Sequence, residues 1–436
     1  MSKIHGNFGG QPVYVVDGAR TPFLKARGKP GAFTASDLAV GAGRPLLARQ
    51  KFSPDQLDEV ILGCAMPSPD EPNIGRIAAL RLGCGDKVPG WTVMRNCASA
   101  MQALDSAARN IALGRSDLVL AGGTESMSHA PILFNDAMVN WLAGMAAARS
   151  PGQKLQQVLK LRPGHFSPVI GLLKGLTDPI AGINMGQTCE VIAHRFGITR
   201  EAMDAFAVRS HQRLAAAIDA GRMGEVEALY DDSGHAHETD DGLRRDSSEA
   251  KLATLKPFFD RRVGLVTAAN SSQITDGAAL LILASARAVK EHSLPVLGRI
   301  LDSEWAALDP AEMGLGPVHA STPILQRQGL GLGDLDHWEI NEAFAGQVLA
   351  CIAAWEDADY CRDQLGLKGA LGTLDQEHLN TDGGAISIGH PVGASGARIV
   401  LHALNALQQS GGDHAIATLC IGGGQGGAML LARGTE

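Results

Sequence analysis

The last third of the chain repeats, faintly but in the same order, a pattern found in the first third. Residues 57–63 (LDEVILG) are echoed 278 positions later by residues 335–341 (LDHWEIN), and a helix-like segment of small and apolar residues precedes each. Residues 118–123 (LVLAGG) are echoed by 418–424 (TLCIGGG) at an offset of about 301. The repeat predicts a fold of two similar halves, with insertions in the second half that lengthen the offset.

Each half reads as strands followed by helices, which predicts parallel sheets covered by helices in the α/β class. A length of 436 residues allows two domains that each bury most of their apolar surface. The glycine-rich stretch 422–427 and the glycines of 329–333 lack the strand, G-x-G-x-x-G and helix order of a dinucleotide site. We therefore interpret these glycines as places of close backbone approach.

Composition limits the classes of function that the chain can have. The chain is 45% hydrophobic and 19% charged, as globular proteins are, and its net charge of -8 argues against a general nucleic-acid binder. No apolar run approaches the ~20 residues that span a bilayer, and residues 1–10 lack the apolar segment of a secretion signal. We expect a cytoplasmic protein.

The seven cysteines indicate a reducing compartment. They are too sparse and irregular for a disulfide framework, and none forms a C-x-x-C pair. The stretch 234–242 (GHAHETDDG) has no accompanying cluster of ligands, so we read it as a polar loop and predict no metal site.

Cys97 has the setting of a nucleophile. It lies where a strand-like run, residues 91–95, gives way to a helix-like run. Apolar residues recur after it at helical spacing, at Met101, Leu104, Ala108 and Ile111. The thiol should therefore lie near a helix N-terminus, whose partial positive charge favours the thiolate.

Four motifs in a fixed order carry a resemblance to a known family. They are residues 121–127 (AGGTESM), 341–345 (NEAFA), 389–391 (GHP) and 419–424 (LCIGGG). Together with Cys97 they resemble the thiolase family over almost the whole length of the chain. The resemblance implies a thiolase fold, in which two similar βαβ-type halves stack in five layers (α-β-α-β-α) with an inserted loop domain.

The repeat and the resemblance together suggest domain boundaries. We expect an N-terminal half at 1–124 plus 255–292, an inserted loop domain at 125–254, and a C-terminal half at 293–436. The chain leaves the repeat between about residues 125 and 254.

The resemblance also implies catalytic roles. Cys97 would attack the substrate and carry the acyl group, and His390 would deprotonate the Cys97 thiol. Cys420 would be the second acid/base. The backbone N–H groups of Gly422 and Cys97 would stabilise the oxyanion of the acyl-enzyme, and Asn341 would fix a water that completes a second oxyanion hole.

On the substrate side, the family's pattern marks residues that would contact the acyl chain or the pantetheine arm. They are Ser272, Met313, Phe344, Asn184 and Met185. Coenzyme A (CoA) would be a co-substrate, with no permanently bound cofactor. Asn184 stands where short-chain biosynthetic relatives have histidine, which argues against an acetoacetyl-specific role.

The expected activity is CoA-dependent cleavage of a 3-oxoacyl-CoA into acetyl-CoA and a shortened acyl-CoA, through an acyl-cysteine, in fatty-acid β-oxidation. Residues 346–350 (GQVLA) and the acidic, aromatic run 355–360 resemble the thiolase subunit of fatty-acid oxidation complexes. Alternatives are an acetoacetyl-CoA thiolase working in the condensation direction, a decarboxylating condensing enzyme, and a non-catalytic assembly subunit. The condensing enzymes usually have a second histidine where this chain has Asn341, and they lack an acid/base cysteine like Cys420.

Residues 137–177 form a basic insert without a single acidic residue. Its five cations are Arg149, Lys154, Lys160, Arg162 and Lys174, interleaved with apolar stretches. This composition suits an anionic lipid surface or the groove of a hydratase/dehydrogenase partner subunit. It equally suits a solvated cover whose cations face CoA phosphates. A homodimer or tetramer is expected from the resemblance.

Overall fold

The computed structural model describes residues 7–434. Of residues 1–10, in which we expect no secretion signal, the first six lie outside the described part. The predicted first strand, from Val13, is present. The strands of the N-terminal half are β1 (Val13–Arg20), β2 (Leu24–Lys25), β3 (Glu59–Gly63), β4 (Gly90–Val93), β5 (Leu118–Ser126) and β10 (Thr275–Ala284). Its helices are α1 (Ala35–Ala48), α2 (Ile74–Arg81), α3 (Ser99–Ala112) and α10 (Ala286–Glu291).

The C-terminal half repeats most of this order, but its described residues form no strand between β12 and β13 to match β4. Its strands are β11 (Gly298–Ala307), β12 (His337–Ile340), β13 (His414–Ile421) and β14 (Gln425–Arg433). Its helices are α11 (Gly316–Gln328), α12 (Ala345–Glu356), α13 (Ala358–Leu365), α14 (Ala385–Ile388) and α15 (Ser395–Ser410). The echoed segments of the sequence are therefore β3 with β12, and β5 with β13.

The sheets of the two halves are joined. One hydrogen-bonded path runs β12-β13-β14-β11-β1-β10-β5-β3-β4, and the two halves meet where β1 pairs with β11. The prediction of purely parallel sheets is wrong at one strand in each half. β10 runs antiparallel to β1 and β5, and β14 runs antiparallel to β13 and β11. For β14 the reason is its connection, because the three-residue turn after β13 can only form a hairpin.

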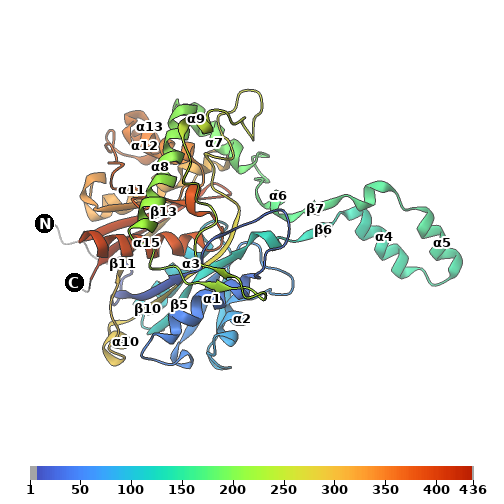
Figure 1. Cartoon of the computed structure of the whole chain (residues 1–436), viewed down its shortest axis with the longest axis horizontal. Helices are drawn as coiled ribbons and strands as arrows, with labels where there is room; N and C mark the ends of the chain where they lie inside the picture. The colour runs from blue at the N-terminus through green and yellow to red at the C-terminus, as the bar shows by residue number, and fades with distance from the viewer. Residues whose placement is uncertain (1–6, 435–436) are drawn as a thin grey trace.

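Alternating burial along the strands produces three cores and five layers. In β5, Leu120 packs into a core with α1 and α2, whereas Val119 faces the opposite way into a core with α3 and α15. A third core lies between the C-terminal sheet and α11 and α12. The layers are thus α1/α2, sheet, α3/α15, sheet and α11/α12, as Figure 1 shows, and the predicted five-layer fold is confirmed.

The two middle helices touch at their first turns. A Cβ added to Gly396 in α15 would lie 2.6 Å from the backbone nitrogen of Met101 in α3, closer than any side chain allows. Glycine at this point lets the two helices approach closely. The loops that lead into α3 and α15, which carry Cys97 and His390, are therefore brought together.

Between β5 and β10 the chain makes a long excursion. It contains β6 (Ile132–Phe134), α4 (Asp136–Ala147), α5 (Pro151–Leu159), β7 (Pro168–Ile170), α6 (Gly171–Gly175), α7 (Met185–Arg195), α8 (Arg200–Asp219), β8 (Leu229–Tyr230), β9 (Ala236–His237) and α9 (Glu249–Leu252). Residues 132–170, here called the arm, form a β6–β7 ribbon that carries α4 and α5 away from the body (Figure 1). The rest of the excursion lies against the body, where α7 and α8 contact α12. The three-part domain division stays a prediction.

Within residues 7–434, no helix is long and apolar enough to cross a membrane. The described residues also contain no group of three metal-ligating side chains. All seven cysteines are free thiols.

Candidate active site

Cys97 lies two residues before α3, in a short loop that follows β4. The loop is tied to the helix, because the Arg95 amide donates to Ser99 Oγ (2.9 Å) and Ser99 Oγ donates to the Asn96 carbonyl (2.7 Å). The side chain of Cys97 is only partly exposed. The structure thus places Cys97 at a helix N-terminus, where the sequence predicted it.

The predicted preference for the thiolate is wrong for the free site. Burial raises the pKa of the Cys97 thiol, and the nearby Glu125 carboxylate adds to this. The backbone N–H groups of Gly422 and of Cys97 itself favour the charged sulfur, but burial outweighs them. Sequence shows the helix terminus but not the depth of burial, and burial decides the direction.

His390 is buried in the loop before α15. Its backbone amide donates to the Gln273 carbonyl (3.1 Å), and its Nδ1 lies 2.6 Å from Ser395 Oγ. Its Nε2 is buried without a protein hydrogen-bond partner. Burial, together with the positive charge of Arg398, lowers the pKa of His390 to about 4, so the imidazole is neutral at neutral pH. A neutral imidazole can accept a proton from a thiol.

Cys420 lies in strand β13, one residue before the strand ends. The glycine loop begins two residues later, at Gly422. Burial and the neighbouring Cys97 raise the pKa of the Cys420 thiol well above its usual value. Cys420 is therefore a protonated thiol close to Cys97, a form that can donate a proton.

Asn341 follows β12 and is fully buried. Its backbone amide donates to the Thr418 carbonyl (3.0 Å), which fixes it beside β13. Its side-chain Nδ2 and Oδ1 both lack protein partners, as does His390 Nε2. Buried polar atoms of native proteins are normally satisfied, so such atoms indicate a place for a water or a ligand group.

Glu125, at the end of β5, ties the His390 loop to the N-terminal half. Its carboxylate accepts the amides of Ala65 (2.8 Å) and Met66 (3.0 Å), and it lies against Gly393, three residues after His390, where an added Cβ would be 2.7 Å from Glu125 Oε2. The sequence motif contained Glu125, but its spacing from Cys97 gave no sign of this contact.

The predicted substrate-side residues gather on neighbouring backbone. The Ser272 amide donates to the Ala343 carbonyl (2.9 Å), and the adjacent Ser271 forms a bridge to Phe344. The Phe344 ring meets Phe259 edge to face, with centroids 6.0 Å apart. Phe259 was not predicted, because nothing in its own segment marks it.

The remaining three predicted substrate-side residues are Met185, Met313 and Asn184. The sulfur of Met185 lies 3.4 Å from the position of a Cβ at Gly422, so Met185 lies against the glycine loop. Met313 is buried in a 3-10 helix, Pro310–Leu315, that contacts α7 and β13. Asn184 is the N-cap of α7: its Oδ1 accepts the Gln187 amide (3.0 Å). Capping alone explains an asparagine at this position.

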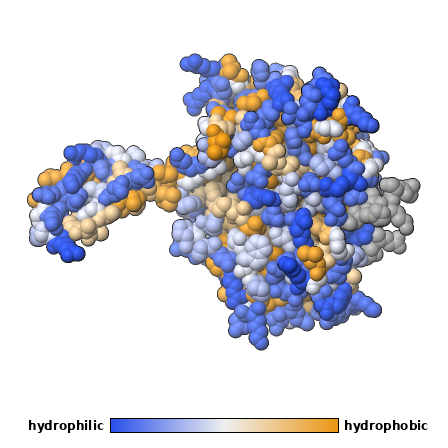
Figure 2. All heavy atoms as spheres, turned by 180° about the vertical axis from the view of Figure 1, so that it is seen from behind, coloured by the Kyte–Doolittle hydropathy of each residue, from blue (hydrophilic) through white to orange (hydrophobic). Residues whose placement is uncertain are grey.

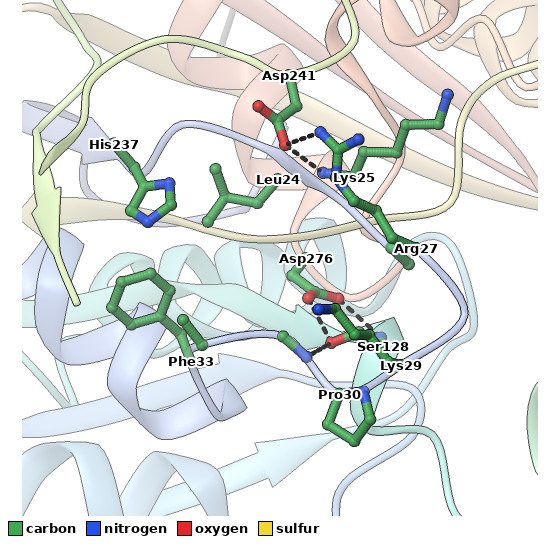
Figure 3. Close-up of a pocket in the computed structure, with 13 residues that line it drawn as sticks. Leu24, Lys25, Arg27, Lys29, Pro30, Phe33, Ser128, His237, Asp241 and Asp276 are labelled. Carbon is green, nitrogen blue, oxygen red and sulfur yellow. Dashed lines mark hydrogen bonds and ion pairs between the residues drawn. The ribbon is translucent and has the colours of Figure 1, made fainter. Parts of the chain in front are cut away.

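An open cavity of about 370 Å³ lies elsewhere, under the loop of residues 25–33 (Figure 3). None of the ten predicted site residues lines it. Its acidic side chains are already bonded: Asp276 accepts Ser128 Oγ (2.5 Å), and Asp241 pairs with Arg27 (3.3 Å). The cavity is therefore not a candidate active site.

Comparisons with known proteins show a similarity that covers almost the whole chain. The chain matches the model of the thiolase N-terminal domain over residues 13–287 and that of the thiolase C-terminal domain over 294–433. A 3-ketoacyl-CoA thiolase of Yersinia pestis is 36% identical over 425 residues, which are 97% of each chain.

Two solved structures are similar over nearly the whole chain. The acetyl-CoA acetyltransferase of Bacillus anthracis is 34% identical with a TM-score of 0.83, over 98% of this chain and 100% of the other. The human mitochondrial 3-ketoacyl-CoA thiolase in complex with CoA is 34% identical with a TM-score of 0.82, over 98% of both.

Proposed function

Because this chain belongs to the thiolase family, we propose that it is a 3-ketoacyl-CoA thiolase, an acyltransferase that uses CoA as co-substrate. It cleaves a 3-oxoacyl-CoA into acetyl-CoA and an acyl-CoA shortened by two carbons, as a cytoplasmic enzyme of fatty-acid β-oxidation. One observation carries the proposal: the Gly422 turn is bonded to the residue before Cys97, through Asn96 Nδ2 and the Gly422 carbonyl (2.8 Å), so that the backbone N–H groups of Gly422 and Cys97 lie beside the Cys97 sulfur and favour its charged form. Such a pair is what an oxyanion at an acyl-cysteine requires.

In the proposed first half-reaction, His390 Nε2 accepts the Cys97 proton and the sulfur attacks the 3-oxo carbon. The resulting oxyanion is stabilised by the N–H groups of Cys97 and Gly422. The C2–C3 bond then breaks, and its electron pair passes into the enolate of acetyl-CoA. His390, with a water held by Asn341, stabilises the enolate oxygen, and Cys420 donates the proton that completes acetyl-CoA.

In the second half-reaction, the Cys420 thiolate removes the proton of incoming CoA. The CoA sulfur attacks the acyl-cysteine, the Cys97–acyl bond breaks to release the shortened acyl-CoA, and the departing Cys97 sulfur takes back the proton held by His390. Ser272, Met313, Phe344, Asn184 and Met185 are proposed to line the acyl and pantetheine path.

The test is thiolysis by the purified chain of acetoacetyl-CoA and of a longer 3-oxoacyl-CoA, with free CoA. We expect cleavage of both, with the larger kcat/KM for the longer substrate. If neither substrate is cleaved, the proposal that the chain is a thiolase is rejected. If only acetoacetyl-CoA is cleaved, the result favours the alternative of an acetoacetyl-CoA thiolase. The similarity to an acetyl-CoA acetyltransferase makes that alternative specific. A kcat/KM series over acyl lengths separates the two.

We further propose a homodimer or a dimer of dimers, formed through β4. This strand ends the sheet, so one of its edges is unpaired in the described chain. Trp91 and Met94, in and just after β4, are exposed. An unpaired apolar edge is a natural place for a second copy. Light scattering of the purified chain tests it, and a monomer contradicts it.

The arm is proposed to bind an anionic membrane surface. Its exposed apolar side chains include Ile132 (72% exposed), Phe134 (63%), Leu159 (67%) and Phe166 (62%). All five cations of residues 137–177 are exposed. Hydrophobic and hydrophilic surface therefore alternate along the arm, as Figure 2 shows. Cations attract anionic headgroups, each by about 1 kcal/mol, and apolar side chains enter the interface.

Flotation with vesicles tests this role. The chain should float with phosphatidylglycerol vesicles and less with phosphatidylcholine vesicles, and a variant with Lys154, Lys160 and Arg162 changed to Gln should float less. The matched control changes three exposed lysines outside the arm, Lys87, Lys290 and Lys368, to Gln. Equal loss in both variants, or no flotation, contradicts the membrane role and leaves a hydratase/dehydrogenase subunit as the arm's partner.

A further inference from the structure

Asn96, the residue before Cys97, has an unusual backbone conformation. Its φ is +44°, in the left-handed region that asparagine adopts more readily than other side chains except glycine. Its carbonyl accepts both the Ser99 amide (3.1 Å) and Ser99 Oγ (2.7 Å), which hold the conformation in place. The Asn96 side chain is thereby directed away from α3.

That side chain reaches across to the C-terminal half. Asn96 Nδ2 donates to the Gly422 carbonyl at 2.8 Å, although the two residues are 326 positions apart. Gly422 begins a turn of three glycines in which Gly423 and Gly424 have φ of +94° and +73°. Glycines have no side chains to anchor a turn, so a bond from outside restricts it strongly.

Gly422 lies against two consecutive residues. Its carbonyl accepts from Asn96 (2.8 Å), and its N–H lies on the side of the Cys97 sulfur, whose charged form it favours. If the carbonyl were released, the turn could rotate and carry the N–H away from the sulfur. The direction of a backbone donor decides what it contributes to an anion.

We propose that Asn96 is a positioning residue, which locks the glycine turn so that the Gly422 N–H points at the Cys97 sulfur and at the oxyanion formed beside it. This inference rests on the proposed acyl transfer. Asn96 acts through Gly422 and does not touch the reacting atoms. The Asn96–Gly422 hydrogen bond, here called the clamp, also aligns the two halves, because it joins the loop that carries Cys97 to the turn that follows Cys420.

The decisive variant is Asn96→Gly, because glycine adopts the same left-handed backbone and loses only the carboxamide. Asn135→Gly is the matched control: Asn135 Nδ2 donates to the carbonyls of Gly164 (2.8 Å) and Ser167 (2.7 Å), in the arm. Four quantities are measured in each variant: kcat and KM for thiolysis, the melting temperature, and the pH midpoint of Cys97 alkylation by iodoacetamide. Mass spectrometry identifies the alkylated residue.

For Asn96→Gly we expect kcat to fall roughly 10- to 100-fold with KM unchanged, because a catalytic donor is misaligned while the substrate path is intact. The alkylation midpoint should move to higher pH, because the thiolate loses the Gly422 N–H. Asn135→Gly should leave kcat and the midpoint as in the wild type.

An Asn96→Gly protein with wild-type kcat and midpoint overturns the proposal. A lower melting temperature with an unchanged midpoint also overturns it, because Asn96 would then only hold the fold together. If the wild type shows no thiolysis, the proposed function fails, yet the alkylation midpoints still test the clamp.

Discussion

Cys97 and His390 are both uncharged at neutral pH. Burial raises the pKa of the thiol, and burial with Arg398 lowers the pKa of the imidazole to about 4. A pre-formed ion pair is therefore not the resting state. In the proposed reaction, the proton of Cys97 moves to His390 as the sulfur attacks, when the N–H groups of the proposed oxyanion hole become engaged.

Cys97→Ser tests the nucleophile. A serine hydroxyl is a far weaker nucleophile than a thiol in the same place, so kcat should fall by at least about 10³-fold. Incubation with radiolabelled acetyl-CoA should label the wild type at Cys97 and leave the variant unlabelled. Label retained on another residue of the variant contradicts the assignment.

The pKa of His390 predicts the acid limb of activity. The imidazole accepts a proton only when neutral, so kcat/KM should hold well below pH 6.5 and fall as the pH approaches about 4. The same shift affects stability. Between about 4 and 6.5 the unfolded chain binds more protons, so this contribution is complete above 6.5 and is lost as the pH falls. A kcat/KM profile with a midpoint near 6.5 contradicts the prediction.

At this scale the sequence indicated candidate residues but not their protonation states. Cys97, His390, Cys420 and Gly422 came from motifs whose order identified them. The thiolate expectation failed because burial is a property of the folded chain. Asn96 stood next to the predicted nucleophile, yet its carboxamide's partner lies in the other half and has no local signal.

Among the elements, the contact between α3 and α15 matters most for the site. Their first turns touch at Gly396 and Met101, and each helix begins after a loop that carries a proposed catalytic residue. The helices are among the elements that the 3.6-residue pattern predicted well. Strand direction was predicted less well, because β10 and β14 reverse through connections that composition does not reveal.

Gly396→Ala tests that contact. The added methyl group would lie 2.6 Å from the Met101 nitrogen, so the helices must separate. We expect a loss of about 1–3 kcal/mol in the free energy of unfolding, measured in urea, and a lower kcat. Gly152→Ala in α5 is the control, because a Cβ there meets nothing within 4 Å and alanine favours helix. Equal stability in both variants contradicts the expectation.

At the scale of the whole molecule, a buried ion network joins the excursion to both halves. His402 in α15 bonds Glu225 (2.9 Å), which also pairs with Arg20 of β1 (3.4 Å), and Arg20 pairs with Asp240 (2.7 Å). These side chains are almost fully buried. The Glu225 and Asp382 carboxylates raise the pKa of His402 to about 10 despite its burial, so it is charged at neutral pH.

His402→Leu should therefore destabilise the chain by about 3–5 kcal/mol, because Glu225 loses a buried partner. In the wild type, the unfolded chain gives up the His402 proton near pH 6.5 and the folded chain near 10. The stabilisation is thus complete below 6.5 and is lost as the pH rises toward 10. Urea unfolding from pH 6 to 10 should show this loss in the wild type and not in the variant. A variant with the same pH dependence contradicts the assignment to His402.

The doubled architecture was visible in the sequence because the two halves keep the same order of strands and helices. The joined sheet and the ion network were not visible in the sequence. Glu225 and Asp240 are separated from their partners His402 and Arg20 by 177 and 220 positions, and a charged residue in a sequence does not reveal whether it is buried. Long-range pairing of this kind exists only once the halves have stacked.

The excursion between β5 and β10 sets the order in which the protein can be made. On the ribosome, β5 emerges long before β10, the antiparallel neighbour that completes its ladder. At roughly 5–20 residues per second, the nascent chain exposes that open ladder for about 7–30 s. During translation the edge of β5 therefore stays unpaired until β10 is made. Chaperones that bind unpaired strand edges would protect the nascent chain from aggregation during this interval.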